Sequence, residues 1–352
     1  MARKKRKNVF FGITARAMMT GAACLLLLSY LSRFANPAKL WFLTIFGLAF
    51  MPLVLLNVAL LVLAAYRRSS AFFIPFLALL PSIFILGSGF QVKGFEPDGS
   101  GVRIVTYNVG QLRASDLDPK ACKDSVIRFL RSTDADIICI QEYHCDPGVD
   151  VGRELSRSFP GYHSEYFVNV SDQSSYGNVI LSRFRVLDKG KMNFEKSANL
   201  ALYADILIGD TKIRVYNCHL ESYNISLKRL FSGTQRDEIV KETETKMKKS
   251  ITRRPKQVRE VLKNIENCPV EAIVTGDFND TPLSYTYYRL SKGRGDSFVD
   301  AGHGLGSTFN GPLPFLRIDY VLYPDHYKAT GHKVCKDIKF SDHYPIITEI
   351  NI

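Results

Sequence analysis

Three long apolar stretches occupy most of the first 90 residues, and they constrain this chain more than any other feature. Val9–Ser32 contains one charged residue, Arg16, whereas Leu40–Tyr66 and Ser70–Phe90 contain none. A helix that crosses a bilayer needs about 20 apolar residues. Three such stretches in a row are poorly explained as buried core helices. A cleaved signal peptide also fits poorly, since no small-residue cleavage site precedes more apolar sequence. We therefore predict an N-terminal membrane anchor, residues 1–91, with about three transmembrane helices near 9–32, 40–66 and 70–90.

The positive charge of the chain is concentrated beside these stretches. The formal net charge is +12, but residues 1–100 hold 11 basic and 2 acidic residues, whereas residues 101–352 hold 35 and 32. The excess lies at 3–7 and at Arg67-Arg68, positions that flank the apolar stretches. Basic residues beside a span mark its cytoplasmic side. The charge is therefore a topology signal, and nucleic acid is a possible partner that the charge of residues 101–352 does not indicate.

The side of the membrane follows from the number of spans. With three spans, the N-terminus and the Arg67-Arg68 loop are cytoplasmic and the C-terminal region is outside. If Val9–Ser32 only lay on the membrane surface, the C-terminal region would be cytoplasmic, and the charges would fit about equally well. Seven cysteines favour the second arrangement mildly, since an oxidising compartment tends to pair or remove them. We favour a multi-pass protein of the cell (inner) membrane whose C-terminal domain is extracytoplasmic.

The sequence changes character after a polar, Gly-containing linker at residues 92–101. Short β-branched or apolar runs, bounded by Gly, Asn, Asp or Pro, then alternate irregularly with helical patterns. The runs are Val102–Asn108, Ile137–Gln141, Val179–Ser182, Ala201–Ile208, Ile213–Cys218, Ala272–Gly276, Ile318–Tyr323 and Ile346–Ile350. Helices are predicted over Asp118–Ser132 and Pro255–Glu266. Residues 102–352 are therefore predicted to form an α+β domain of two packed mixed sheets with outer helices.

One segment of this domain is an insertion that is dense in charge and low in hydrophobicity. It covers Tyr223–Thr252 and is rich in Lys and Glu. Such a segment is typical of a solvated helix or a mobile loop. No internal repeat accompanies it.

Polar residues recur where the predicted strands end, and a strand end exposes a side chain to a site. They are Asn108, Glu142, His219, Asp277, Asn279, Asp319, Asp342 and His343. Each alone would be an ordinary turn former or solvated end. Together they form a set of carboxylates, amides and two histidines without a thiolate cluster. No Gly-x-Ser-x-Gly elbow and no P-loop is present.

This set of side chains suits one chemistry. Carboxylate oxygens bind Mg²⁺, which shares its remaining positions with phosphate oxygens. A histidine held by a carboxylate can take a proton from water, and a second can donate one to a leaving oxygen. The cation neutralises charge that builds on the phosphoryl group. The residues therefore predict Mg²⁺-dependent hydrolysis of a phosphate ester.

The same residues lie in blocks that resemble the endonuclease/exonuclease/phosphatase superfamily, the fold of deoxyribonuclease I. In family order, the blocks are Thr106-Tyr107-Asn108, Gln141-Glu142, 177–182 (Gly-Asn-Val-Ile-Leu-Ser), His219-Leu220, 276–279 (Gly-Asp-Phe-Asn), 317–320 (Arg-Ile-Asp-Tyr) and Ser341-Asp342-His343. The resemblance covers residues 102–352. It implies a four-layer α/β/β/α sandwich with the active site at one edge of the two sheets.

The resemblance also implies a metal site and phosphate contacts. Glu142 looks like the principal ligand, with Asn108 and Asp342 as further metal ligands. The implied cofactor is Mg²⁺, and Mn²⁺ could substitute. Asn108, Asn279 and His219 resemble residues that contact phosphate. Arg254 opens an Arg-x-x-Gln step and could add a contact, although the start of a solvated helix explains it as well.

Proton-transfer roles follow from the resemblance too. His343 resembles the general base, which Asp319 orients. Asp277 and Asn279 look like the pair that positions the attacking water. His219 resembles the second histidine, which contacts phosphate and protonates the leaving group. Its acidic partner is open, with Glu165 and Asp172 as candidates.

Several alternatives stand beside an active, monomeric, membrane-tethered phosphoesterase. The domain could bind a phosphorylated ligand without turnover, or the membrane segments could be a channel or scaffold. Within the enzyme class, a nuclease, a lipid phosphodiesterase and a sugar or inositol phosphatase are all open. Phe309 and Phe315 are the exposed aromatics a lipid phosphodiesterase would need, whereas residues 223–252 could supply basic groups to a phosphatase.

Overall fold

The chain divides into two compact units in the computed structural model, which describes residues 2–94, 99, 101–113, 117–146, 148–170, 175–223 and 236–352. The N-terminal unit comprises Met1–Gly87 together with Thr281–Tyr288, and the sheet unit comprises Ser88–Asp280 and Arg289–Ile352. Strand β1 (Phe90–Val92) pairs with β11 (His303–Leu305), so the sheet unit begins before the predicted linker.

The N-terminal unit contains fewer candidate spans than its hydropathy predicts. Helix α1 (Ala2–Leu31) includes Gly12–Leu31, which is long and apolar enough to cross a membrane. Helices α2 (Phe42–Leu48) and α3 (Phe50–Tyr66) would count as a second span only as a pair bent by 62°. The third stretch forms η1 (Ser70–Phe72), α4 (Phe73–Leu79) and α5 (Ser82–Leu86). The prediction of about three spans is therefore wrong: the described residues hold one, or at most two.

Prolines explain the difference. A proline lacks the backbone N–H, and its ring clashes with the carbonyl four residues earlier. Pro52 stands four residues after Leu48, the last residue of α2, and Pro81 separates α4 from α5. Hydropathy alone does not register these interruptions. The predicted multi-pass arrangement loses its support with the third span, and so does the side of the membrane inferred from it.

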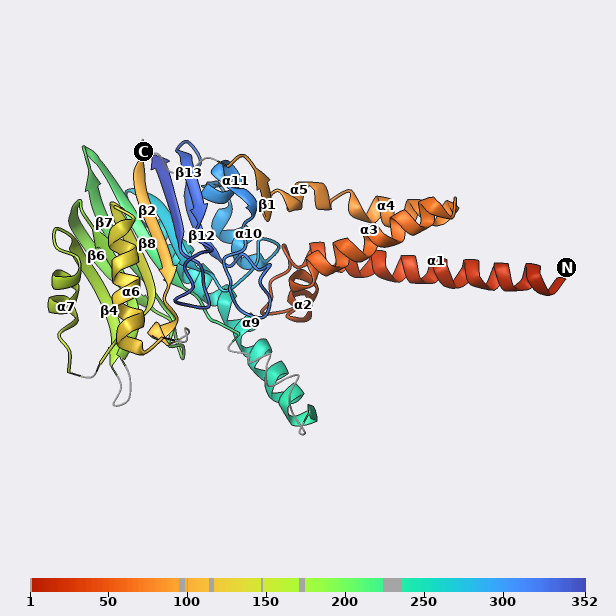
Figure 1. Ribbon diagram of the computed structural model, residues 1–352, viewed down its shortest axis with the longest axis horizontal. Helices are drawn as coiled ribbons and strands as arrows, with labels where there is room; N and C mark the ends of the chain where they lie inside the picture. Colours follow the sequence, from red (N-terminus) through yellow and green to blue (C-terminus); the bar gives the residue numbers. More distant parts are fainter. Residues whose placement is uncertain are drawn as a thin grey trace. The chain divides into compact units, whose positions relative to one another are not determined.

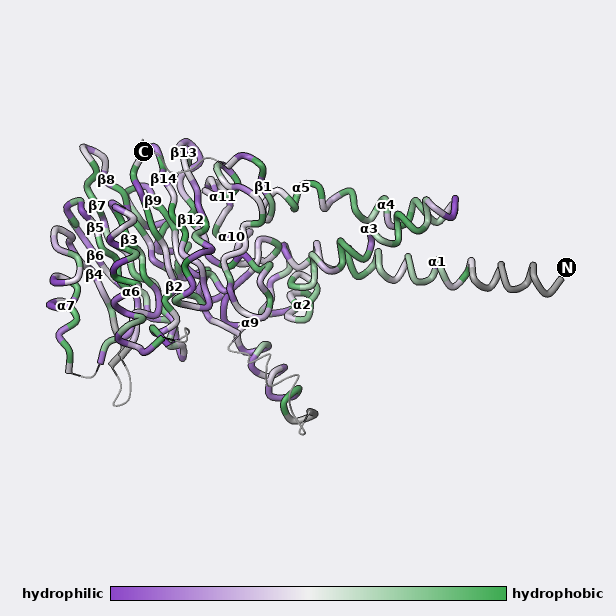
Figure 2. The backbone as a smooth tube through the Cα atoms, viewed as in Figure 1, coloured by the Kyte–Doolittle hydropathy of each residue, from purple (hydrophilic) through white to green (hydrophobic). Residues whose placement is uncertain are grey.

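The segment Thr281–Tyr288 is distant in sequence from the rest of the N-terminal unit but packs inside it. Leu283 is buried in an apolar cluster that includes Leu26 and Leu53. The Ser32 hydroxyl donates to the Leu283 carbonyl at 2.9 Å. Helices α3 and α4 of this unit are predominantly hydrophobic (Figure 2). Apolar burial and a hydrogen bond from the Ser32 side chain to the Leu283 backbone thus hold the segment in this unit.

Two six-stranded sheets build the sheet unit (Figure 1). The first sheet has the order β13-β14-β2-β3-β5-β4 and the second β10-β12-β9-β8-β7-β6. The first contains β2 (Val102–Asn108), β3 (Ile137–Cys145), β4 (His163–Val170), β5 (Ser175–Ser182), β13 (Lys328–Val334) and β14 (Ile346–Asn351). The second contains β6 (Arg185–Asn193), β7 (Leu200–Ile208), β8 (Thr211–His219), β9 (Glu271–Asp277), β10 (Arg294–Asp296) and β12 (Asp319–Pro324). Each sheet is antiparallel except for one central parallel pair, β2 with β3 and β8 with β9.

The strands present one apolar face to the other sheet and one to helices. Residues such as Ile104, Ile137 and Val215 form the core between the sheets. Their neighbours in sequence, including Val105 and Ile138, pack instead with α6 (Pro119–Ser132) and α7 (Val151–Ser158). Both faces are thus apolar, as in strands covered on both sides. The prediction of an α+β fold with two packed mixed sheets is confirmed, and every predicted run corresponds to a strand.

The outer face of the second sheet is covered by α9 (Arg236–Glu266), where the Tyr216 hydroxyl donates to Asn264 Oδ1 at 2.8 Å. This helix begins well before the predicted start at Pro255, which lies inside it. The predicted insertion 223–252 therefore forms the first part of α9 from Arg236 on, whereas residues 224–235 lie outside the described residues. The short helices η2 (Gly110–Leu112), α10 (Tyr285–Ser291) and α11 (Ser297–Ala301) complete the described elements.

Buried amides connect the two sheets beneath their common edge. Asn217 on β8 donates to the carbonyls of Ile140 (2.9 Å) and Val179 (2.8 Å) in the first sheet. Its Oδ1 accepts a hydrogen bond from Gln141 Nε2 at 2.6 Å. Asn178 Nδ2 donates back to the Asn217 carbonyl at 3.2 Å. Because buried polar groups need partners, this network fixes the alignment of one sheet against the other.

A second buried polar cluster lies against β13. The Asp296 carboxylate binds the guanidinium of Arg317, and His332 Nδ1 lies 2.9 Å from Ser297 Oγ. His332 Nε2 is buried and has no hydrogen-bond partner in the described chain. Burial lowers the pKa of His332 to about 3, so the imidazole is neutral in the folded chain.

We expect Asn217→Ala to lower the free energy of unfolding by about 3 kcal/mol, since three buried partners lose a hydrogen bond. That loss corresponds to a fall in Tm of about 5 to 10 °C in a domain of this size. Thermal unfolding of the full chain in detergent measures it. Asn193→Ala, at the exposed end of β6, is the control and should leave Tm unchanged. Equal Tm values for both variants would contradict the proposed role of the network.

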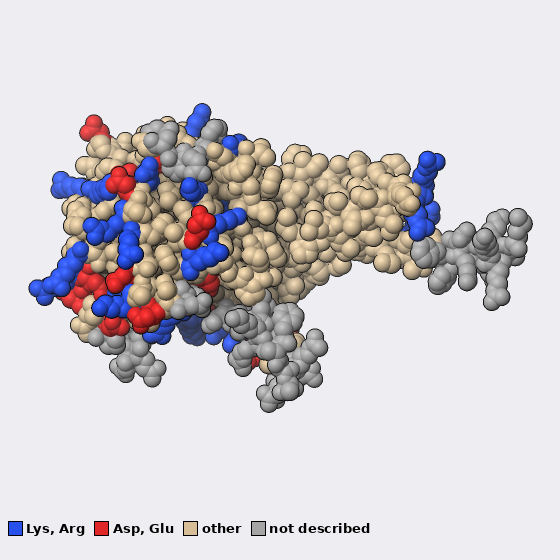
Figure 3. All heavy atoms as spheres, viewed as in Figure 1, with Lys and Arg blue, Asp and Glu red and all other residues tan. Residues whose placement is uncertain are grey.

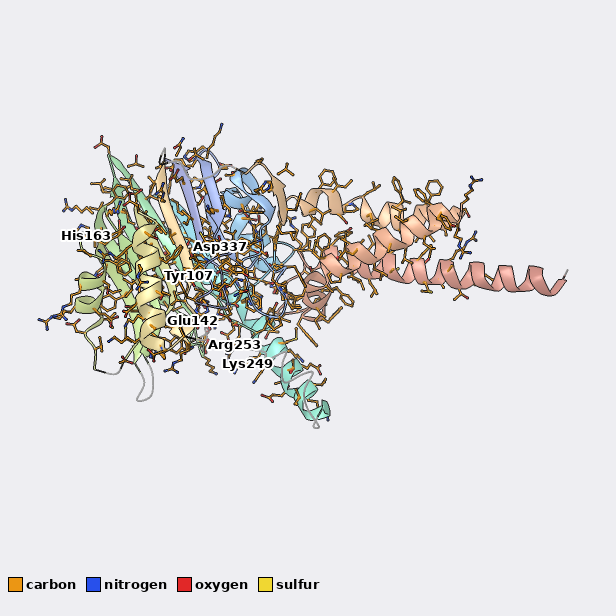
Figure 4. All side chains as sticks on the ribbon, in the orientation of Figure 1. Tyr107, Glu142, His163, Lys249, Arg253 and Asp337 are labelled. Atoms are coloured by element: carbon orange, nitrogen blue, oxygen red, sulfur yellow. The ribbon has the colours of Figure 1, made fainter. Side chains whose placement is uncertain are left out.

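Acid should destabilise the fold through His332. Its pKa is about 3 when folded and about 6.5 when unfolded, so below pH 6.5 the unfolded chain binds a proton that the folded chain does not. Stability therefore falls as pH drops, by about 2 kcal/mol at pH 5 from this residue. His332→Asn should reduce the difference in Tm between pH 7.5 and pH 5. The exposed His163 provides the control (Figure 4), and His163→Asn should leave that difference as it is in the unaltered chain.

Candidate active site

Three of the predicted site residues form a row across the second sheet. His219 is the last residue of β8, Asp277 the last of β9 and Asp319 the first of β12. The register pairs Asp277 with His219 on one side and with Asp319 on the other. Directly paired residues project from the same face of a sheet. Strand register alone therefore brings two carboxyl groups and an imidazole together.

Gly276 allows this row to form. Its φ is +119°, a conformation that L side chains rarely adopt. A Cβ at this position would lie 2.1 Å from the Cys218 carbonyl oxygen on the adjacent strand. A larger residue would separate β9 from β8 next to Asp277. Glycine is thus required for the close approach of these strands.

The first sheet contributes Asn108 and Glu142. Asn108 is the last residue of β2, whereas Glu142 lies within β3, where the pairing with β5 shifts register between Ile140 and Tyr143. Glu142 has φ +54°, which is unusual for a glutamate. A bulge of this kind redirects a side chain, and strained backbone tends to occur at functional sites. The irregularity turns Glu142 (Figure 4) towards His219, whose Nε2 lies 3.5 Å from Glu142 Oε1.

Asp277 is the centre of the site. Its Oδ2 accepts hydrogen bonds from Asn108 Nδ2 (3.0 Å) and Asn279 Nδ2 (2.9 Å). The Nε2 atoms of His343 and His219 lie 3.7 and 3.9 Å from the same oxygen. Burial raises the pKa of the Asp277 carboxyl to about 6. One buried oxygen thus collects two amides and faces both histidines.

Asp319 and His343 form a buried pair next to this centre. His343 Nδ1 lies 2.9 Å from Asp319 Oδ2, and the Thr308 hydroxyl accepts the Asp319 N–H at 3.1 Å. The Phe309 ring contacts the imidazole edge-on at 5.5 Å. Burial by itself would lower the pKa of His343, but the charges of Asp319 and Asp277 outweigh it, and the pKa lies well above its ordinary value.

His219 Nε2 is buried and has no hydrogen-bond partner in the described chain. Of the two acidic partners predicted for His219, Glu165 binds Lys189 at 2.6 Å instead. Asp172 lies outside the described residues. The acidic groups near His219 Nε2 are instead Glu142, at 3.5 Å, and Asp277, at 3.9 Å.

The residues expected to hold a metal differ in what they offer. Glu142 is partly exposed and presents a carboxylate oxygen, the donor that Mg²⁺ prefers. Asp342 is exposed, and Ser341 Oγ donates to its Oδ1 at 3.2 Å. Asn108 directs its amide nitrogen at Glu142 and its oxygen at the Gly110 N–H, so its amide would have to turn to act as a ligand. The oxygen donors of Glu142 and Asp342 fit a hard cation.

Asp277, Asp319 and His343 also lie close enough together to hold an ion. Their arrangement fits proton transfer better, because Asp319 already holds His343 Nδ1 at 2.9 Å. A buried imidazole nitrogen is moreover a poor ligand for Mg²⁺. Glu142 therefore stays the predicted principal ligand of the cation.

Arg254 is enclosed rather than exposed to a substrate. Its Nη1 lies 2.7 Å from Asp280 Oδ2, and its guanidinium stacks over the Tyr223 ring at 4.2 Å. Both charged groups are buried. The neighbouring Arg253 is half-buried and binds Glu221 at 3.0 Å. The geometry favours a structural role for Arg254, in which it holds the chain just after Asn279.

Three supporting residues were not among the predicted site residues. Asn217 and Gln141 connect the sheets, and Thr308 positions Asp319. Gln141 directly precedes Glu142, and Asn217 lies two residues before His219. The sequence of a strand does not indicate which group an amide side chain in it will bind. Thr308 lies in a loop, and its contact depends on a distant strand.

Comparison with known proteins identifies a family for most of the chain. The sequence profile described as "Endonuclease/Exonuclease/phosphatase family" matches residues 105–343. A domain of unknown function (DUF8431) matches residues 9–89. No curated protein matches the chain.

Solved structures share the fold at low sequence identity. An endonuclease/exonuclease/phosphatase from Beutenbergia cavernae is 19% identical, with a TM-score of 0.53 over 71% of each chain. A family protein from Leptotrichia buccalis is 17% identical, with a TM-score of 0.52 over 71% of this chain and 100% of that one. The human nocturnin catalytic domain, solved with a bound sulfate anion, is 16% identical, with a TM-score of 0.51 over 71% of this chain and 94% of that one.

We expect Arg254→Met to lower the free energy of unfolding by about 3 to 5 kcal/mol, because the buried Asp280 carboxylate loses the cation that faces it. Arg253→Met, one residue earlier, removes a half-exposed pair and should cost about 1 kcal/mol or less. Thermal unfolding of the full chain measures both losses. If Arg254 instead contacts phosphate, its variant would keep the original Tm and raise KM.

Proposed function

This chain belongs to the endonuclease/exonuclease/phosphatase family, whose members are hydrolases of phosphate esters, and we propose that it cuts its ester by in-line attack of a water with Mg²⁺ as the cofactor. The observation that carries the proposal is the surroundings of Asp277 Oδ2. Two amide N–H groups, from Asn108 and Asn279, fix this oxygen, and two imidazole nitrogens face it within 4 Å. A site for phosphate binding alone has no need of such a carboxylate.

Each side chain then has a defined task. Asn279, held in a left-handed conformation with φ +52°, and Asp277 orient the water. His343 takes its proton, because the carboxylates of Asp319 and Asp277 make the imidazole a strong proton acceptor. His219, whose buried Nε2 has no hydrogen-bond partner among the described residues, donates to the leaving oxygen or to phosphate.

The metal and this machinery are complementary. Glu142, with Asp342, would hold a divalent cation, which would supply positive charge to neutralise the phosphoryl oxygens. Asn108 holds Glu142 Oε1 at 3.3 Å and Asp277 Oδ2 at 3.0 Å, so it fixes the metal-binding and water-orienting carboxylates relative to each other. Mn²⁺, which takes similar ligands, would substitute for Mg²⁺.

We further propose that the N-terminal unit anchors this enzyme in a membrane. The Gly12–Leu31 part of α1 is apolar over 20 residues. Exposed apolar side chains such as Leu55, Val62 and Phe84 continue along the other helices of the unit. On the face shown in Figure 3, Lys and Arg gather at one end of these helices. The rest of the described helix surface on that face is uncharged. Such a surface suits lipid better than water.

The full chain in detergent should hydrolyse bis-p-nitrophenyl phosphate or DNA only with Mg²⁺ or Mn²⁺, and a chelator should abolish turnover. Glu142→Ala and His343→Ala should each lower the rate by at least about 100-fold, since each removes a group that acts in the transition state. Initial rates measured by released nitrophenolate test this.

Two controls accompany these variants. Glu165→Ala removes a carboxylate that binds Lys189, and His163→Asn removes an exposed imidazole. Both should keep the original rate. Metal-dependent turnover that survives in both Glu142→Ala and His343→Ala would overturn the assignment. Tight phosphate binding without turnover in the unaltered chain would indicate a non-catalytic member of the family.

A further inference from the structure

An uncharged apolar loop stands directly beside the catalytic histidine. From Ser307 to Leu316 the chain contains no charged residue, and 312–315 (Pro-Leu-Pro-Phe) are all exposed. Leu313 and Phe315 each keep 38% of their surface exposed. Apolar side chains that remain in water next to an active site indicate a contact with something apolar.

Hydrogen bonds tie this loop to the site rather than leaving it free. The Phe309 N–H donates to the Leu316 carbonyl at 3.1 Å and closes the loop at its base. Phe309 also forms a β-bridge with His343, and the Asn310 N–H donates to the Asp342 carbonyl at 2.7 Å. Leu313 and Phe315 are therefore held at a fixed place next to His343 and Asp342.

The chain on the other side of the site leads into the apolar N-terminal unit. Thr281 is the first residue of the segment that packs in that unit, and it follows Asn279 by two residues. Two residues of chain span no more than about 7 Å. The next residues are anchored there, since Leu283 is buried among apolar side chains of α1 and α3 and Tyr288 contacts Phe34 at 5.1 Å between ring centroids. Two residues of chain thus connect Asn279 to the segment that belongs to the N-terminal unit.

We propose that the phosphate ester is carried by a lipid of the membrane that holds the N-terminal unit, with Leu313 and Phe315 in contact with its apolar part. This inference rests on the proposed function and names its substrate class. Aromatic and aliphatic side chains at the level of lipid headgroups are stabilised there, whereas in water they are not.

The alternatives fit these observations less well. A nucleic-acid strand would lay its phosphates along the protein and needs basic contacts beside the site, yet the loop next to His343 has none. A free sugar phosphate would make no use of the exposed apolar side chains of Leu313 and Phe315. It would not require an enzyme that is anchored in a membrane. The test below includes both as outcomes.

The experiment compares the hydrolysis of the same headgroup on a long-chain lipid and on a short-chain, water-soluble analogue. The full chain is reconstituted in vesicles that contain sphingomyelin, phosphatidylinositol or phosphatidic acid. Its turnover of each lipid is compared with turnover of the short-chain, water-soluble analogue and of bis-p-nitrophenyl phosphate. We expect at least one long-chain lipid in the same vesicle to be hydrolysed about 10-fold or more faster than its short-chain analogue, and faster than the same lipid in separate vesicles.

Variants test the loop itself. The double substitution Leu313→Ser and Phe315→Ser should lower the ratio of lipid to soluble turnover about 10-fold. Leu187→Ser is the matched control, because Leu187 on β6 is also 38% exposed and should leave the ratio unchanged. An unchanged ratio in the double variant would overturn the assigned contact.

The two proposals fail in distinguishable ways. Metal-dependent hydrolysis of bis-p-nitrophenyl phosphate without hydrolysis of any lipid would overturn the lipid inference and leave the proposed function standing. Faster turnover of DNA, RNA or a soluble sugar phosphate than of every lipid would overturn it too. Absence of hydrolysis with every substrate would overturn the proposed function itself.

Discussion

A carboxylate buried away from water is costly unless its surroundings satisfy it, and Asp277 imposes this condition on the whole sheet unit. Its partners come from both sheets: Asn108 from the first, Asn279 from the turn after β9, and histidines from β8 and from the loop before β14. Neither sheet alone could hold this group. The amide network of Asn217 and Gln141 fixes the sheets a few residues away, so packing of the core and assembly of the site depend on the same alignment.

The sequence predicts the central strands of the two sheets well and their edge strands poorly. Every predicted strand is found, whereas β4, β6, β10 and β13 were missed, and these are the strands at the four edges of the two sheets. An edge strand pairs on one side only and carries polar side chains, as in β6, whose residues are largely exposed. Its stability comes from the neighbouring strand, which a local pattern cannot register. Pro52 and Pro81 are the reverse case, in which a local signal that hydropathy ignores decides where helices end.

The candidate site divides in the same way. The convergence of Asp277, Asp319 and His219 follows from polar residues at strand ends, which sequence patterns reveal. The direction of Glu142 depends on a bulge against β5, and the enclosure of Arg254 depends on Asp280 and Tyr223, which are distant in sequence. Such features arise from tertiary contacts. They are also the features that decide whether a polar residue faces a substrate or the interior.

The segment Thr281–Tyr288 has a further consequence for the architecture of the chain. Because it belongs to the N-terminal unit, the backbone passes between the two units three times: at Gly87, at Asp280 and at Tyr288. A unit joined by one linker can be cut away without loss, but this N-terminal unit takes Thr281–Tyr288 into its own core. A cut after Gly87 would strip Leu283 of its apolar surroundings beside Asn279. The N-terminal unit is thus completed by a segment from far along the sequence, and its two parts depend on each other to fold.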